Sequence, residues 1–249
     1  MVRVIIFDFD GTLTEGDGPA LRYAEEVLQA VSESQRSQLR RQIDEDFRLA
    51  GPRRWGGCLD GFDAVHRRAV QHHVEEGLLE KAYLRSRDAL ARGVVPVSIP
   101  QGLIPFLGQL PAYRVVITNS PMHGTREILR LTGVDAVVDE LRADAGKPSG
   151  LTSAVRDFAE QIGIDEVLCV GDIWSNDLKP AYDLGGPTAL ISHGRPVNVP
   201  ATFAGDGFAE LYAPITAWAR GEIWPSHEPS PKSGTRESVV RGESSADVE

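Results

Sequence analysis

From residue 113 to residue 192 the chain alternates short apolar segments with segments of helical periodicity, and this alternation constrains the fold more than any other feature. It predicts strands at 113–118, 136–138, 167–170 and 188–192, with helices at 122–132, 151–162 and 178–184. The opening segment, Val2 to Phe9, is apolar almost throughout and predicts a further strand that is buried on both faces. Strands that alternate with helices form parallel sheets covered on both faces. The expected fold class is therefore α/β, with a doubly wound parallel sheet.

Residues 19–92 depart from this alternation and show only helical periodicity. Breaks at 51–52, 56–57 and 77 divide the block into about four helices. We expect an all-helical cap over residues 16–97, inserted into a Rossmann-like core made of residues 1–15 and 98–222. The core should end in an amphipathic helix at 208–219. Residues 223–249 are rich in Ser, Pro, Gly and charge, which predicts a disordered tail.

The charge and the cysteine content exclude several classes of protein. The net charge is −10, from 26 basic and 36 acidic residues, which argues against a surface that grips nucleic acid or an anionic membrane. No apolar run approaches the roughly 20 residues that cross a bilayer. Two cysteines, Cys58 and Cys169, are too few for a disulfide framework. We therefore expect a cytoplasmic protein with no nucleic-acid partner and no membrane partner.

Polar side chains follow the predicted strands where ligands bind in open α/β sheets, at the carboxyl ends. These residues are Asp8, Asp10, Thr118, Asn119, Lys147, Asp172 and Asp177. Clustered carboxylates raise one another's pKa unless a cation lies among them, and hard oxygen ligands favour Mg²⁺, which commonly bridges to a phosphate. The Lys147 amine and the Thr118 hydroxyl can neutralise phosphoryl oxygens. The set predicts a magnesium-assisted reaction at a phosphate group.

The motifs at these positions resemble those of a known family. The segment Asp8-Phe9-Asp10-Gly11-Thr12-Leu13-Thr14 is similar to the first motif of the haloacid dehalogenase superfamily. Thr118, Lys147 and the segment from Gly171 to Asp177 match its later motifs in order and in strand context. The resemblance covers residues 1 to about 220, and the helical block is similar to the cap that this family places after its first strand.

The resemblance implies roles for these residues in two steps of chemistry. Asp8 would be the nucleophile that forms an aspartyl-phosphate. Asp10 would protonate the leaving oxygen and later activate water. Thr118 would hydrogen-bond the phosphoryl group, and Lys147 would hold Asp8 and the phosphoryl charge. Asn119 would contact the phosphate or the leaving group.

The resemblance also implies a magnesium site. Asp8, the backbone carbonyl of Asp10 and Asp172 would bind Mg²⁺, whereas Asp177 would bind it through water or orient Lys147. Members of the family that cleave carbon–halogen bonds lack an acid at the position of Asp10, because a halide leaves without a proton. The resemblance therefore implies a phosphatase that acts on a small phosphorylated metabolite. A phosphomutase acting on a sugar phosphate and a non-catalytic binding protein of this family remain alternatives.

Simpler structural roles compete with these assignments. The acids at the strand ends suit turns and helix caps, and Lys147 suits an exposed loop. Arg54 lies in a predicted loop of the cap at 53–57, where a guanidinium could bind a substrate anion. The pair His72-His73 lacks a third ligand at a suitable spacing and is expected to be solvated or half-buried. The segment His193-Gly194-Arg195 follows the last predicted strand and faces the edge of the site.

Overall fold

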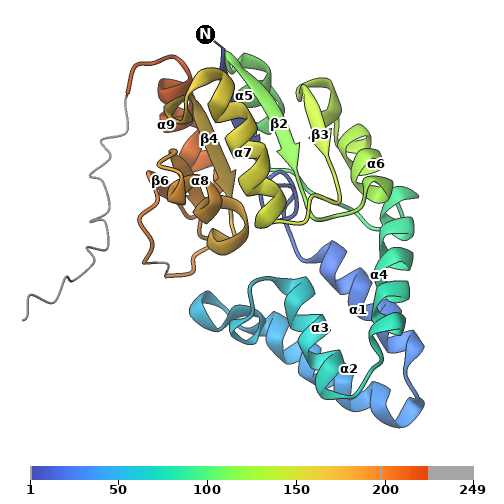
Figure 1. The fold of residues 1–249 in the computed structure, drawn as a ribbon. Coiled ribbons are helices and arrows are strands. Elements are labelled where there is room, and N and C mark those ends of the chain that lie inside the picture. Colours follow the sequence, from blue (N-terminus) through green and yellow to red (C-terminus); the bar gives the residue numbers. More distant parts are fainter. Residues whose placement is uncertain (1, 197, 224–249) are drawn as a thin grey trace, which may run out of the picture.

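The sheet confirms the predicted α/β class. The computed structural model describes residues 2–196 and 198–223, and within these residues six strands form one parallel sheet in the order β3-β2-β1-β4-β5-β6 (Figure 1). The strands are β1 (Arg3–Phe7), β2 (Ala112–Ile117), β3 (Glu140–Arg142), β4 (Val167–Gly171), β5 (Thr188–Ile191) and β6 (Phe203–Gly205). The predicted tail lies, from residue 224 onward, outside the described residues.

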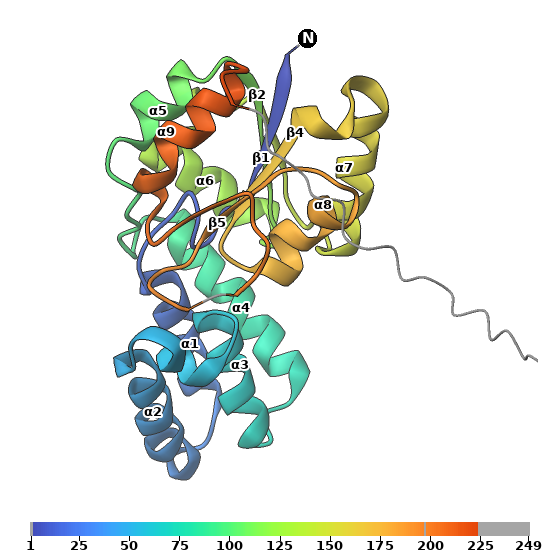
Figure 2. The same cartoon turned by 90° about the vertical axis from the view of Figure 1, so that its left-hand side faces the viewer.

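Helices cover both faces of the sheet (Figure 2). In β1, Ile5 and Phe7 point to one face and Val4 and Ile6 to the other, as the period of two in a strand requires. The first face packs against α5 (Leu103–Gln109), α6 (Met122–Thr132) and α9 (Phe208–Ala219). The second face packs against α7 (Ser149–Ile162) and α8 (Lys179–Asp183). A strand with an apolar layer on each side explains why the sequence before Asp8 is almost continuously apolar.

The block between β1 and α5 folds into helices without a strand, and we call it the helical insert (residues 16–97). It contains α1 (Gly18–Ala30), α2 (Glu33–Arg48), α3 (Gly61–Gln71) and α4 (Glu76–Ala91), with a 3₁₀ segment at Gly51–Gly57. A hydrophobic cluster of its own, which includes Val27, Leu39 and Leu79, holds these helices together. Figure 1 shows the insert beyond the carboxyl ends of the strands. Its two connections to the sheet meet at a bridge between Glu15 and Ser98.

The structure corrects some sequence-based predictions. Residues 136–138 are not a strand: a 3₁₀ turn covers Val134–Ala136, and β3 follows at Glu140–Arg142. Directly before β3, the Asp139 carboxylate accepts hydrogen bonds from the backbone and guanidinium of Arg114 in β2. The break predicted at Gly77 falls earlier, since α4 already begins at Glu76. Two short elements, α5 and β6, were not predicted. Within the part of the chain that the structure describes, no helix has the length and apolarity to cross a bilayer.

Candidate active site

The candidate site lies where the strand order of the sheet reverses. The strands that follow β1 in sequence extend the sheet in one direction through β2 and β3 and in the other through β4, β5 and β6. Crevices at such a switch point, outside the carboxyl ends of the strands, are the usual ligand sites of this architecture. Asp8 directly follows β1, and Asp172 directly follows β4. The pairing continues past β1, because the amide of Asp8 donates to the carbonyl of Val170 (2.9 Å).

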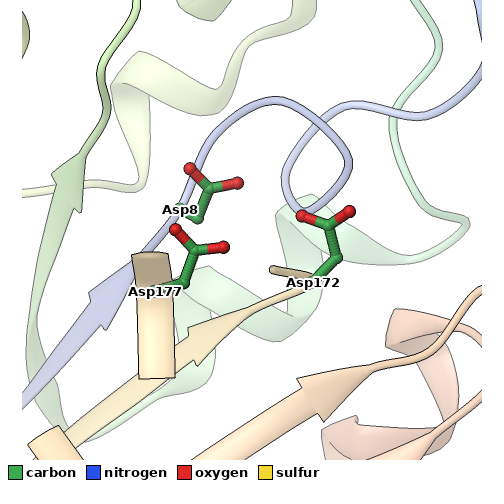
Figure 3. A group of neighbouring side chains, drawn as sticks. All are labelled: Asp8, Asp172 and Asp177. Atoms are coloured by element: carbon green, nitrogen blue, oxygen red, sulfur yellow. The ribbon is translucent and has the colours of Figure 1, made fainter. Parts of the chain in front are cut away.

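Three carboxylates meet at this point (Figure 3). Asp8, Asp172 and Asp177 each offer an oxygen within 4.8 Å of the others, and all three residues are buried. Among residues 2–196 and 198–223, they are the one group of three or more such side chains close enough to share a metal ion. The sheet thus brings together acids that are far apart in the sequence, as the strand-end argument predicted.

Lys147 is the counter-charge of this cluster. Its amine donates to Asp8 Oδ1 (2.5 Å) and to Asp177 Oδ1 (2.7 Å), and only 4% of its side chain is exposed. It is therefore not the exposed loop lysine of the simpler interpretation. Asn119 holds the loop in place, because its amide group exchanges hydrogen bonds with the backbone of Lys147 (2.6 and 3.3 Å). Asn119 therefore lies at the site and positions the backbone of Lys147.

Both carboxylate oxygens of Asp177 accept hydrogen bonds. One accepts from Lys147, and the other accepts from the backbone amide of Ile173 (2.9 Å). The adjacent strand end is packed closely against it, since a Cβ on Gly171 would lie 2.4 Å from the Cβ of Asp177. Of the two roles that the family resemblance implies for Asp177, this arrangement favours the orientation of Lys147.

The burial of so many acids shifts their titration. Burial raises the pKa of Asp8 to about 7, although Lys147 lowers it, and the charge of Asp177 raises it further. Burial and the charges of Asp8 and Asp177 likewise raise the pKa of Asp172 well above its usual range. Burial alone would lower the pKa of Lys147, but the attraction of two anions outweighs it and raises that pKa. Lys147 therefore cannot neutralise all three carboxylates, and Arg195 offsets the charge of Asp172 only in part.

These residues fit a divalent cation. Asp172 Oδ1 is buried and has no hydrogen-bond partner, while Oδ2 lies 3.5 Å from the guanidinium of Arg195. A buried carboxylate oxygen without a partner is costly unless a ligand completes it. Gly11 gives room for this carboxylate, because a Cβ there would lie 2.8 Å from Asp172 Oδ2. The carboxylate oxygens of Asp8 and Asp172 form a donor set that suits Mg²⁺.

Hydroxyl groups line the other side of the cluster. Thr12 donates to Asp8 Oδ2 (3.1 Å) and so holds the carboxylate from the side opposite Lys147. The hydroxyl oxygen of Thr118 accepts from the amide of Ser120 (3.0 Å), which orders the turn after β2. Thr118 therefore caps this turn and lines the site at the same time.

The side chain of Asp10 turns away from the three carboxylates and toward the helical insert. It accepts from the hydroxyl of Ser120 (2.6 Å) and from Arg87 Nη2 of α4 (2.9 Å). Any contribution of Asp10 to a metal would thus come from its backbone carbonyl, as the resemblance implies. The sequence analysis did not identify Arg87. The sequence signal that could have identified Arg87 is its position in α4, at a helical spacing from the buried residues Leu79, Ser86 and Leu90.

A cavity of about 190 Å³ lies beside Asp8, Lys147 and Asp177, whereas Asp172 lines a neighbouring pocket. The core contributes Asp8, Asp10, Thr118 and Lys147 to the wall of the cavity, and the insert contributes Asp60, Phe62, Tyr83 and Arg87. Burial raises the pKa of Asp60 above its usual range, although the amide of Asp63 donates to its carboxylate at the start of α3. The volume is below the ~300–1,000 Å³ typical of pockets for drug-sized ligands. The site therefore accepts a small molecule.

Several other predicted residues lie outside this cavity. Arg54 donates to Asp17 (3.0 Å) and stacks on Trp55, so its guanidinium is occupied within the insert. His72 is half-buried and hydrogen-bonds to the side chain of Gln42. His193 bonds to the carbonyl of Gly11 (2.7 Å) at the edge of the site.

The comparison with protein families identifies this chain. The model of the haloacid dehalogenase-like hydrolases matches residues 2–185. The protein therefore belongs to the haloacid dehalogenase-like hydrolases, as the motifs around Asp8, Thr118, Lys147 and Asp172 indicated. A comparison with curated proteins gives no significant match.

Solved structures of this superfamily share the fold. The HAD-hydrolase YfnB from Bacillus subtilis, solved with bound magnesium, is 18% identical with a TM-score of 0.60, covering 86% of this chain and 98% of that one. A predicted phosphoglycolate phosphatase from Haemophilus somnus is 17% identical with a TM-score of 0.59, covering 85% and 97%. A dehalogenase is 18% identical with a TM-score of 0.54, covering 86% and 97%. At these identities the similarity establishes the fold, and the chemistry has to be argued from the site.

Proposed function

We propose that this protein is a magnesium-dependent phosphatase that hydrolyses a small phosphorylated metabolite through an aspartyl-phosphate on Asp8. The observation that carries the proposal is the place of Asp10 in the wall of the cavity that also contains Asp8 and Lys147. A carboxyl group in this place can donate a proton to a departing alkoxide, whereas a halide leaves without one. Asp10 therefore favours the hydrolysis of a phosphate ester over dehalogenation.

The reaction would proceed in two steps. In the first, a carboxylate oxygen of Asp8 bonds to phosphorus, the bond from phosphorus to the ester oxygen breaks, and Asp10 gives that oxygen its proton. In the second, Asp10 takes a proton from a water molecule that attacks the same phosphorus, which releases phosphate and regenerates Asp8. Lys147 and Thr118 would stabilise the negative charge on the phosphoryl oxygens in both steps.

Asp8, Asp172 and the backbone carbonyl of Asp10 are the proposed magnesium ligands, with Asp177 acting through Lys147. When bound, Mg²⁺ supplies positive charge that offsets the clustered carboxylates and the charge of the phosphoryl group. The unpartnered oxygen of Asp172 supports this assignment. The raised pKa of Asp8 supports it as well, because a cation in contact with Asp8 would restore its nucleophilic, ionised form at neutral pH.

We further propose that residues 16–97 act as a cap on a core made of residues 1–15 and 98–222. The insert supplies Phe62, Tyr83 and Arg87 to the wall of the cavity, opposite the strand ends. A cover of this kind excludes bulk water and strengthens electrostatic interactions with the phosphoryl group.

The test is phosphate release by the purified full chain from p-nitrophenyl phosphate, with Mg²⁺ and with EDTA. We expect turnover with Mg²⁺ only, and its loss in Asp8→Asn. Asp157→Asn is the matched control, because Asp157 is an exposed aspartate on α7. Asp10→Asn should slow esters with poor leaving groups far more than p-nitrophenyl phosphate, since only the poor leaving groups require a proton. Full activity in Asp8→Asn, or no phosphate release by the wild-type chain with Mg²⁺, would overturn the proposal.

A further inference from the structure

Arg87 is a buried cation in the wall of the candidate active site. Only 1% of its side chain is exposed. Its guanidinium lies 5.0 Å from the ring centres of both Phe62 and Tyr83, which hold it by cation–π contacts. The backbone of Arg87 is also fixed, because a Cβ on Gly124 of α6 would lie 3.0 Å from its carbonyl oxygen. Packing thus holds the cation in the wall of the cavity that Lys147 also lines.

The hydrogen-bonding capacity of this guanidinium is only partly used. Nη2 donates to Asp10 Oδ2 at 2.9 Å, and Nη1 donates to Asp10 Oδ1 over a longer distance of 3.5 Å. Nε is buried and has no partner. A guanidinium carries five N–H donors in a planar fork that matches a carboxylate. Arg87 therefore retains donors for another planar anion.

The proposed reaction draws Asp10 away from Arg87. Asp10 serves the ester oxygen in the first step and a water molecule in the second, so its carboxyl group has to face the phosphorus. The guanidinium remains charged at every physiological pH. A buried charge that loses its partner is costly, so an anion on the substrate would stabilise the complex in which Asp10 is free to act.

We propose that Arg87 binds a carboxylate of the substrate, and that the substrate is a short phosphorylated hydroxy acid. This inference rests on the proposed phosphatase activity. In the structure the Asp10 carboxylate contacts Arg87, and in the reaction it would contact the ester oxygen. A substrate carboxylate bound to Arg87 would therefore be separated from the ester oxygen by about the width of one carboxyl group. One or two carbon atoms between the ester oxygen and the carboxylate fit this spacing. A second phosphate would bring more negative charge against Asp10 and Asp60 than a carboxylate does.

The test compares esters that differ only in the carboxylate. 2-Phosphoglycerate is compared with glycerol 2-phosphate, and 3-phosphoglycerate with glycerol 3-phosphate. In each pair the alcohol differs from the acid only in having a hydroxymethyl group where the acid has its carboxylate. We expect the wild-type chain with Mg²⁺ to prefer the acid of at least one pair by ~10–100-fold in kcat/KM, the range of a charged hydrogen bond. Arg87→Met should reduce this ratio to about one, and Arg87→Lys should keep part of it. Arg85→Met, an exposed arginine on the same helix, should leave the ratio unchanged.

The outcomes separate this inference from the proposed function. If the wild type releases phosphate from p-nitrophenyl phosphate but treats acids and alcohols alike, the inference is wrong and the phosphatase assignment stands. If it prefers the acids and Arg87→Met keeps that preference, another residue binds the carboxylate and the inference is wrong. If no ester is hydrolysed, both fall. Should Arg87→Met not fold, the wild type and Arg87→Lys still decide, since a wild-type ratio of one or less, or an undiminished preference in a folded Arg87→Lys, contradicts the assignment.

Discussion

The metal-free protein should become more stable when Asp8 is replaced by asparagine. Burial raises the pKa of Asp8 from 3.8 to about 7, even though Lys147 donates to it. The folded chain therefore holds this proton up to neutral pH, whereas the unfolded chain releases it near pH 4. The free energy of unfolding then falls as the pH rises from about 4 through about 7, because the folded state binds more protons in this interval. Asparagine is neutral at every pH and avoids this cost.

The size of the effect follows from the same shift. The pKa rises by about three, and each pKa unit corresponds to about 1.4 kcal/mol, so the upper limit at pH 8 is on the order of 4 kcal/mol. An amide in place of a carboxylate keeps weaker contacts with Lys147 and Thr12, which reduces the gain. We expect a gain of about 2 kcal/mol, or a rise in Tm of about 4–8 °C for a chain of this size.

The assay is thermal unfolding in EDTA at pH 5 and pH 8, with Asp157→Asn as the control for the loss of one exposed charge. The gain of Asp8→Asn should be clearly smaller at pH 5, where the wild type still carries the proton on Asp8 in its folded state. Mg²⁺ should raise the Tm of the wild type more than that of the variant, because the variant lacks a proposed ligand. An Asp8→Asn protein that is less stable at pH 8, or equally stabilised at both pH values, would refute the reasoning.

Three further predictions concern other parts of the site and the cysteines. Lys147→Met should lower the rate of p-nitrophenyl phosphate hydrolysis by about 10²–10³, as loss of an oxyanion-stabilising group does, and a wild-type rate in a folded variant would contradict its role. Gly11→Ala should weaken Mg²⁺ binding in titration calorimetry, because Gly11 has a φ of +87° and a Cβ would lie 2.8 Å from Asp172 Oδ2; unchanged binding would exclude this close approach. Burial raises the pKa of Cys58 to about 11 and also raises that of Cys169, so a thiol reagent at pH 8 should react slowly before and rapidly after denaturation. Rapid labelling of the native chain would show that these thiols are accessible.

Much of the fold was predictable because it depends on local patterns. The apolar run before Asp8 predicted a strand buried on both faces, the apolar run before Asp172 predicted a strand, and the βα alternation predicted a parallel sheet. Short elements escaped this reasoning. The three residues of β3 include Glu140 and Arg142, and they lie at the edge of the sheet, where strand pairing does not require an apolar run. Asp139, next to β3, also contacts Arg114 of β2, a long-range contact that no local pattern reveals.

The convergence of Asp8, Lys147 and Asp172 was likewise predictable, since parallel strands end at one edge of a sheet whatever the details of packing. The sequence by itself therefore determined the core of the candidate site. The helical insert is different, because its periodicity determines which residues face inward but not the angle at which the insert meets the sheet. Only the tertiary structure decided that Arg87 reaches Asp10 while Arg54 pairs with Asp17 inside the insert. Hydrophobic burial sets the inward face of a helix, whereas the partner of a buried charge depends on how two separately packed bodies fit together.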